Sequence, residues 1–165
     1  MPRNMRIASS TAPEPLRIEY QFSQQVGHLL RRAYQRHTAI FQRLCPDAQL
    51  TSVQFAVLCA VADQGACSLA EIGRAAAIDP ATTRGIVERL QERKLIALSS
   101  DRDDKRKVIV ALEPSGRQLV EDILPHAQEI TRRTVRSLNP AEQVALNYLL
   151  QKLSEMTQED FDAEA

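Results

Sequence analysis

The fold is decided by the stretch SLAEIGRAAAIDPATTRGIVERLQERKLI, residues 68–96. Ser68 and Glu71 have the spacing of a capping box, in which the two residues satisfy each other's backbone N–H groups, so a short helix begins there. Asp79-Pro80 starts a second helix, because aspartate is a favoured N-cap and proline fits the first helical position. This second helix is expected to run to about Leu95. Two helices joined by a brief turn predict a helix-turn-helix motif.

The second helix of this motif has one apolar face and one polar face. Ile86, Val87 and Leu90 recur at helical spacing and are expected to pack inward. Such a helix fits the major groove of B-DNA and can present its first turns to base edges. The residues that we predict to contact DNA from this helix are Ala81, Thr82, Thr83, Arg84 and Arg89. The alternative is an ordinary solvated face, with Arg84 paired to Glu88 four residues later.

A charged hairpin follows the motif. IALSS (96–100) and VIVAL (108–112) are β-prone runs, and DRDDKRK (101–107) between them predicts a long hairpin tip. Cations at such a tip can reach phosphates or the minor groove that flanks the recognition helix. The tip residues predicted to contact DNA are Arg102, Lys105 and Arg106. A hairpin tip with no DNA contact is the alternative, since neighbouring aspartates cancel part of its charge.

Helix-turn-helix and hairpin together have the order of a winged helix-turn-helix, and here the sequence resembles the MarR family of bacterial regulators over roughly residues 25–155. The similar stretches are LTSVQFAVLCAV (50–61), residues 68–96, and DRDDKRKVIVALEPSGRQL (101–119). Asp104-Lys105-Arg106 matches the family's Asp-x-Arg, in which the aspartate braces an arginine directed at DNA. The resemblance implies a recognition helix in the major groove, terminal helices that build a two-fold dimer, and release by phenolic or aromatic acids.

Three positions depart from the family pattern. Lys94 stands where glycine is common before the first wing strand, and Glu113 stands where threonine usually follows the last one. Members that sense peroxides carry a reactive cysteine early in the first helix, and the matching position here is Gly27. This speaks against thiol sensing.

The flanks of the winged unit are long helices. The resulting division of the chain is a flexible arm (1–19), a first dimerisation helix (20–48), the DNA-binding unit (49–113), C-terminal dimerisation helices (114–157) and an acidic tail (158–165). Leu146, Leu149, Leu150 and Leu153 form an apolar stripe that is too long for a small winged domain to cover. We therefore expect a homodimer, mainly α-helical with a small β-hairpin wing, that binds a pseudo-palindromic double-stranded DNA site.

The first helix also carries groups that could neutralise an acidic ligand. Arginine and protonated histidine pair well with a carboxylate. The residues predicted to bind an aromatic acid are His28, Arg31, Arg32 and Phe55, and His37 lies on the same helix. A surface arginine pair with a histidine in the core or the dimer interface is the alternative interpretation.

Composition limits the other function classes. Hydrophobic residues make up 44% of the 165 residues and charged residues 25%, as in ordinary globular proteins. No apolar run reaches the ~20 residues that span a bilayer, and residues 1–15 lack a signal-peptide core, so we expect a cytoplasmic protein with no membrane contact. The formal net charge is zero, but residues 84–107 hold eight basic and five acidic side chains, whereas the chain from Glu155 onward holds five acidic and no basic ones.

Catalysis and metal binding have no support in the sequence. Cys45, Cys59 and Cys67 form no C-x-x-C pair, and the glycines form no phosphate loop. We therefore expect neither an enzyme nor a bound metal or other cofactor. The sequence predicts a DNA-binding transcription regulator, in the first place a dimeric repressor released by an aromatic acid. A winged-helix protein-interaction module without a defined operator remains the alternative.

Overall fold

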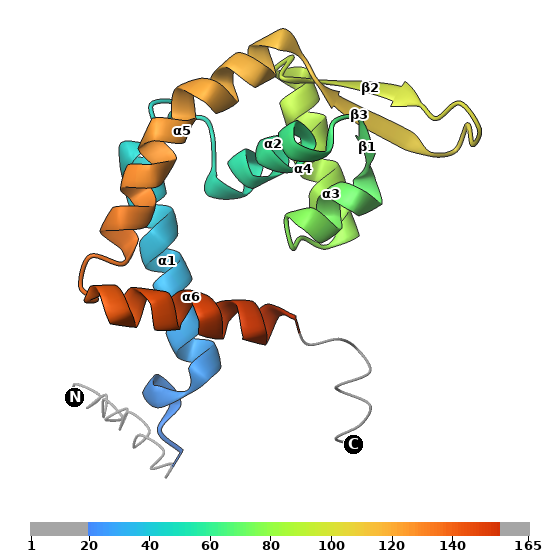
Figure 1. Cartoon of the computed structure of the whole chain (residues 1–165). Helices are drawn as coiled ribbons and strands as arrows, with labels where there is room; N and C mark the ends of the chain where they lie inside the picture. The colour runs from blue at the N-terminus through green and yellow to red at the C-terminus, as the bar shows by residue number, and fades with distance from the viewer. Residues whose placement is uncertain (1–19, 156–165) are drawn as a thin grey trace, which may run out of the picture.

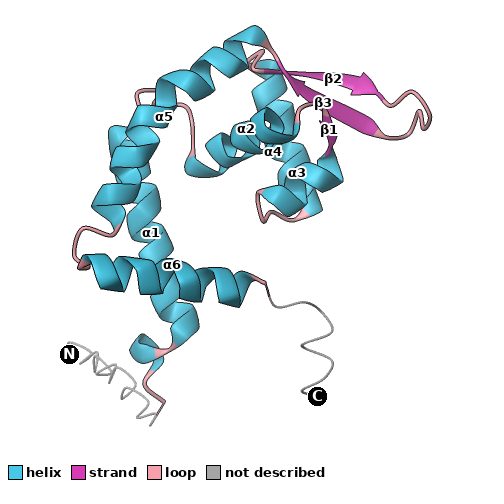
Figure 2. Cartoon of the chain, viewed as in Figure 1, coloured by secondary structure: helices cyan, strands magenta, loops and turns pink. Residues whose placement is uncertain are grey.

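The computed structural model describes residues 20–155, so the arm and the acidic tail expected at the two ends lie outside the described residues. The chain is mainly α-helical with one small sheet, which confirms the predicted fold class (Figures 1 and 2). Its elements are η1 (Phe22–Gln24), α1 (Val26–Leu44), α2 (Ser52–Gln64), β1 (Cys67–Ser68), α3 (Leu69–Ala75), α4 (Pro80–Glu92), β2 (Ile96–Ser100), β3 (Val108–Leu112), α5 (Pro114–Thr134) and α6 (Pro140–Ser154). Within the described chain, no helix has the length and apolar character needed to cross a membrane.

The helix starts follow the predicted caps. Ser68 and Glu71 form both hydrogen bonds of the capping box at α3, and the Asp79 carboxylate accepts a hydrogen bond from the Thr82 backbone N–H (2.9 Å) at α4. Hydrogen bonds from the side chain and backbone of Thr82 hold the pKa of Asp79 below its usual value. The N-cap of α4 is therefore an anion at neutral pH. A negative charge at this position stabilises the helix, because the N-terminus is the positive end of the helix dipole.

The sheet has three strands, one more than the predicted hairpin. β2 and β3 form the antiparallel wing, and β1 pairs with the other edge of β3 through Cys67↔Val110 and Ser68↔Ile109. The sequence predicts a helix start at Ser68 and no strand there, because a two-residue strand has no periodicity of its own. This pairing fastens the wing to α3, so the wing and the helix-turn-helix form one unit.

The core of this unit continues into α5. Leu58 of α2, Ile72 of α3 and Leu90 of α4 are fully buried, and so are Ile123 and Ile130 of α5. α5 extends from the end of the wing and lies beside the C-terminal half of α1 (Figure 1). Pro125 falls inside α5, which remains a single helix from Pro114 to Thr134. α5 thus joins the winged unit to the α1 side of the molecule.

The corner between α4 and β2 explains one departure from the family pattern. Lys94 has φ +58°, the left-handed conformation that glycine adopts without cost. The same backbone in a lysine costs roughly 1–2 kcal/mol. Hydrogen bonds fix the corner nevertheless, since Lys94 N donates to Gln91 O (2.8 Å) and Ser115 Oγ donates to Lys94 O (2.6 Å). The turn is retained without its glycine.

The three cysteines are free thiols. Cys45 and Cys67 are buried and Cys59 is partly buried. Burial raises the pKa of all three thiols, which keeps them protonated and poorly reactive.

Candidate nucleic-acid interface

The exposed face of α4 carries most of the residues predicted to read DNA. Ala81, Thr82 and Arg84 lie on its first two turns and are exposed, as is Arg89 further along. Ile86, Val87 and Leu90 are buried on the opposite face. Within residues 20–155, Arg84 forms no ion pair with Glu88, so its guanidinium is free to meet a base edge. The exposed side of α4 is thus polar, and its buried side packs against the rest of the winged unit.

Thr83 is the exception among the predicted contacts. Its side chain is completely buried, and its Oγ1 donates a hydrogen bond to the Asp79 carbonyl oxygen (2.8 Å). A Cβ on Gly73 of α3 would lie only 3.1 Å from this Oγ1, so the two helices approach closely here. The prediction that Thr83 contacts DNA is wrong, because a threonine on the inner face sets the packing of α3 on α4.

The wing tip is an ordered turn built on two aspartates. The Asp101 carboxylate accepts hydrogen bonds from the backbone N–H groups of Asp103 (2.9 Å) and Asp104 (3.1 Å), and these bonds lower the pKa of Asp101. Asp104 Oδ1 in turn accepts from the backbone N (3.0 Å) and Nε (3.4 Å) of Arg106. The expected bracing of Arg106 by Asp104 is therefore present.

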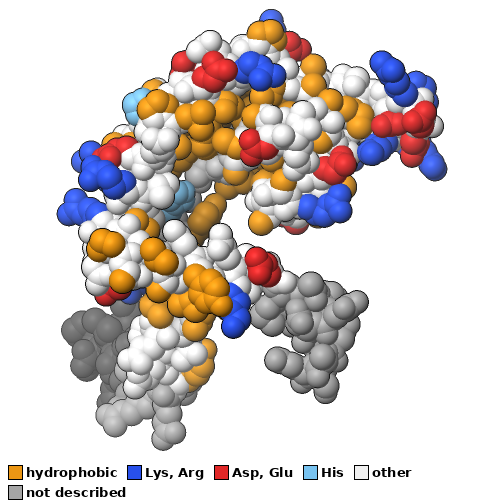
Figure 3. Space-filling model, in the orientation of Figure 1, with side chains coloured by type: hydrophobic (Ala, Val, Ile, Leu, Met, Phe, Trp, Pro, Cys, Tyr) orange, Lys and Arg blue, Asp and Glu red, His pale blue; other side chains and the backbone are white. Residues whose placement is uncertain are grey.

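The braced arginine points into solvent. The side chain of Arg106 is 93% exposed, and Arg102 and Lys105 are exposed beside it. Lysine, arginine and acidic side chains gather at the tip of the wing (Figure 3). Because β1 fastens the wing to α3, these cations have a fixed position relative to the α4 face. One rigid unit therefore presents a polar helix and a cationic tip, as a major-groove reader with a flanking phosphate contact requires.

A cavity of about 520 Å³ separates α1 from the start of α4; we call it the α1–α4 cavity. It is hollowed between the α1 side and the helix-turn-helix (Figure 3). Its lining residues are Tyr34, His37, Ser52, Val53, Ala56, Ala76, Ala77, Ile78, Asp79 and Thr82. Asp79 and Thr82 also form the N-terminal cap of α4. The recognition helix therefore begins in the wall of the cavity.

His37 is the basic group of this cavity. Its Nδ1 lies 3.1 Å from Thr134 Oγ1, and that hydroxyl donates its proton to the Ile130 carbonyl oxygen (2.8 Å). The hydroxyl can therefore only accept from His37, which places a proton on Nδ1. Nε2 is left as the ring nitrogen available to a bound molecule.

The structure does not bring the four predicted ligand residues together. His28 lies against Phe22 with ring centroids 4.5 Å apart, Arg31 and Arg32 are exposed on α1, and Phe55 packs against Phe41 of the core. None of the four lines the α1–α4 cavity. Tyr34 and His37 do, and their spacing of three residues on one helix is the signal that marks them as neighbours.

The comparisons with known proteins agree with this geometry. A model of the MarR family matches residues 50–108. The transcriptional repressor NicR of Pseudomonas putida is 54% identical over 134 residues, which are 81% of this chain and 85% of NicR. The chain belongs to the MarR family. It is accordingly a DNA-binding transcription regulator, in a family whose members are not enzymes.

Solved structures of other members of the family have the same fold. BpsR of Bordetella bronchiseptica, whose DNA binding is regulated by 6-hydroxynicotinic acid, is 60% identical, with a TM-score of 0.79 over 84% of this chain and 99% of that one. MarR of Escherichia coli in complex with operator DNA has a TM-score of 0.74 at 22% identity, over 82% and 99% of the two chains. At that identity MarR shows the shared fold alone.

Replacing Arg106 by alanine is expected to weaken binding to all DNA sequences about equally. A braced cation at the wing tip supplies phosphate or minor-groove attraction and reads little sequence. The slope of log affinity against log salt should fall by about one unit if one phosphate contact is lost. Unchanged affinity with an unchanged slope would show that Arg106 serves only to pair with Asp104.

Arg84→Ala is the matched variant on α4. We expect it to flatten the preference at one symmetric base pair of each half-site, because an arginine fork on guanine is worth ~1–3 kcal/mol of discrimination. Binding selections on randomised DNA measure the sequence profile of both variants. An Arg84→Ala profile identical to that of the unmodified protein, only weaker, would mean that Arg84 holds the phosphate backbone.

Proposed function

We propose that this protein is a dimeric repressor whose DNA binding is released by a small aromatic acid, and that the acid binds in the α1–α4 cavity. The observation that carries the proposal is a cavity of ligand size whose wall includes the N-terminal cap of the recognition helix. Similarity supports it as well, because NicR is a repressor and the DNA binding of BpsR responds to 6-hydroxynicotinic acid.

The lining of the cavity suits an aromatic acid. At about 520 Å³ it falls in the range of roughly 300–1,000 Å³ that small-molecule sites occupy. Val53, Ala56 and Ile78 provide apolar walls for a flat ring. His37 Nε2 can donate to a carboxylate once the ring is protonated, and the Tyr34 hydroxyl can meet a second polar substituent.

Release follows from the shared wall. A ring that fills the space between α1 and the cap of α4 favours arrangements in which these helices stand apart, and the position of α4 sets how two recognition helices fit one DNA site. A tenfold loss of DNA affinity requires only ~1.4 kcal/mol of preference by the acid for the non-binding arrangement. A small displacement of α4 is therefore enough.

The dimer is proposed from the helices that the single chain leaves uncovered. α6 buries none of its residues, although Val144, Tyr148, Leu149 and Leu153 are large apolar side chains that are more than half exposed. A 15-residue helix without tertiary packing is marginal in water. Apolar side chains of η1 and α1 are exposed as well, namely Phe22, Val26, Leu29, Leu30 and Tyr34. A second copy of the chain, related by a two-fold axis, would cover both sets.

The test measures binding to DNA from upstream of the protein's own gene by fluorescence anisotropy, with and without 6-hydroxynicotinic acid. We expect the acid to lower DNA affinity at least about tenfold, a shift of ~1.4 kcal/mol. His37→Gln should bind DNA normally and lose most of this response. The matched control is His126→Gln on the exposed surface of α5, which should respond like the unmodified protein.

Two outcomes would overturn the proposal. If His37→Gln responds normally while alanine variants of His28, Arg31 or Arg32 do not, the acid binds at the site predicted from the sequence and not in the cavity. Absent or salt-insensitive DNA binding would favour the winged-helix protein-interaction module.

A further inference from the structure

A second hollow, distinct from the α1–α4 cavity, lies where the end of α5 meets α1. It has a volume of about 390 Å³, and we call it the arginine pocket. Its lining residues are Arg36, Ile40, Arg43, Leu44, Arg133 and Arg136. None of them lines the α1–α4 cavity or belongs to the predicted DNA contacts. Neither the reading of DNA nor the proposed release by an acid uses this group of residues.

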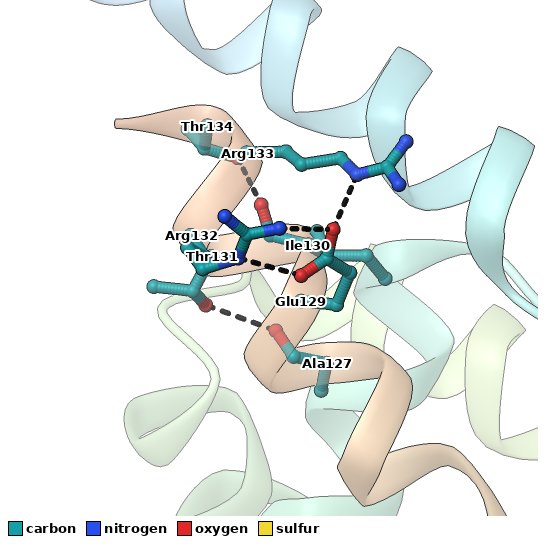
Figure 4. A network of polar contacts seen from close by, with 7 residues as sticks. All are labelled: Ala127, Glu129, Ile130, Thr131, Arg132, Arg133 and Thr134. Atoms are coloured by element: carbon teal, nitrogen blue, oxygen red, sulfur yellow. Dashed lines mark hydrogen bonds and ion pairs between the residues drawn. The ribbon is translucent and has the colours of Figure 1, made fainter. Parts of the chain in front are cut away.

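The arginine pocket holds an excess of positive charge. Within residues 20–155, Arg36, Arg43 and Arg136 pair with no carboxylate. Arg133 is the one lining arginine that pairs with a carboxylate in this described part of the chain, and its partner Glu129 also binds Arg132 (Figure 4). Four arginines therefore line one pocket, and the one carboxylate that pairs with any of them is shared with Arg132. Like charges around one pocket repel one another, so this lining favours an anionic occupant.

The single carboxylate, that of Glu129, orients Arg133 but does not neutralise the charge of the arginine pocket. Hydrogen bonds from Arg132 and then Arg133 lower the pKa of Glu129 to about 2, so that it is ionised throughout the physiological range. Glu129 holds both Arg132 and Arg133 on α5, and Arg133 is the one of the two that lines the pocket (Figure 4). The floor is different in character, because Ile40 and Leu44 are partly buried apolar side chains of α1. An occupant with carboxylates around an apolar group fits both features.

We propose that the C-terminal segment of this protein, MTQEDFDAEA (156–165), binds in the arginine pocket. Phe161 would cover Ile40 and Leu44, and the carboxylates on either side of it would pair with the rim arginines. The segment has the required pattern, with Glu159 and Asp160 before Phe161 and Asp162 directly after it. It contains no lysine or arginine that would oppose binding.

The length of the chain allows this placement. α6 begins four residues after Arg136 and, at ~1.5 Å per residue, its 15 residues span ~22 Å. Phe161 follows Ser154 by seven residues, which reach up to ~24 Å when extended. The segment can therefore return along α6 toward the end of α5.

A small inorganic anion is the rival occupant. Phosphate would pair with the arginines but would leave Ile40 and Leu44 uncovered, whereas the C-terminal segment satisfies both parts of the pocket. The segment is also tied to the chain, so that its local concentration is far above that of a free ligand.

A tryptophan at position 161 tests the proposal. The chain contains no tryptophan, so Phe161→Trp introduces a single fluorescent reporter into the full-length protein. We expect its emission to be blue-shifted and protected from acrylamide, and to move toward that of exposed tryptophan in 1 M salt, where the screening length is ~3 Å. Adding Arg136→Glu should produce the same red shift in low salt. Arg117→Glu, the same charge change on the exposed start of α5, should leave the emission unchanged.

Three results would overturn the proposal. Water-like emission from Phe161→Trp at low salt would show that the segment does not bind. A blue-shifted emission that is insensitive to both Arg136→Glu and the milder Arg136→Gln would place the segment elsewhere. Loss of the blue shift on addition of millimolar phosphate alone, with no change in salt strength, would make the pocket an anion site. Circular dichroism of each variant confirms that it is folded, and no DNA or aromatic acid is needed.

Discussion

Leu149→Asp is expected to turn the dimer into monomers and to abolish tight binding to a palindromic DNA site. Leu149 is 53% exposed on α6, a helix that buries nothing within its own chain. Removing one leucine from an apolar interface costs ~1.5–3 kcal/mol, and a two-fold axis counts the change twice. At 1.4 kcal/mol per factor of ten, the dimer dissociation constant should rise by about 10²–10⁴-fold. Sedimentation at micromolar concentration measures this directly.

The control for this prediction lies on the same helix. Asn147→Asp introduces the same charge two residues earlier, which is ~200° around an α-helix and therefore on the opposite side from Leu149. Asn147 is exposed, and its variant should remain dimeric. A monomeric unmodified protein, or a Leu149→Asp protein that is still dimeric, would show that α6 is not the interface.

Local signals in the sequence predicted most of the winged unit. The capping box at Ser68, the Asp79-Pro80 start of α4 and the bracing of Arg106 by Asp104 all depend on residues within three positions of each other, and the structure contains each of them. Periodicity places Thr83 within the apolar stripe of α4, because the buried Ile86, Val87 and Leu90 follow it by three, four and seven residues. The prediction of a DNA contact followed instead the polar character of Thr83. Its burial is decided by the close approach of Gly73 from another helix.

Features that join distant segments could not be predicted in this way. The α1–α4 cavity takes its lining from three separate helices and the turn before α4, so the sequence indicated a ligand site on α1 but chose residues that do not meet. The ion pair of Arg93 with Asp47 joins the end of α4 to the α1–α2 loop across 46 positions. The arginine pocket likewise depends on α5 lying beside α1, which neither helix signals alone.

The joint between the wing and α5 leads to the second large effect. Gly116→Ala is expected to destabilise the protein strongly, because a Cβ at this position would lie 2.0 Å from the Leu95 carbonyl oxygen and 2.9 Å from its carbon. Both atoms are backbone, so a rotamer change cannot relieve the clash. Glu113 N donates to the same Leu95 oxygen (3.0 Å), and Ser115 Oγ donates to Lys94 O (2.6 Å), so displacing α5 would break these bonds too.

The expected loss of stability in Gly116→Ala is opposite in sign to the usual effect of replacing glycine by alanine in a helix. Alanine in place of a helical glycine normally gains up to ~1 kcal/mol, whereas overpacking costs ~1–3 kcal/mol and each lost hydrogen bond about 1 kcal/mol more. We expect the free energy of unfolding in urea to fall by about 2–4 kcal/mol for Gly116→Ala. Gly27→Ala near the start of α1, where a Cβ meets nothing within 4 Å, should be neutral or stabilising. Equal stability of the two variants would mean that α5 can shift away from Leu95 at little cost, and that the joint between the winged unit and α1 is not rigid.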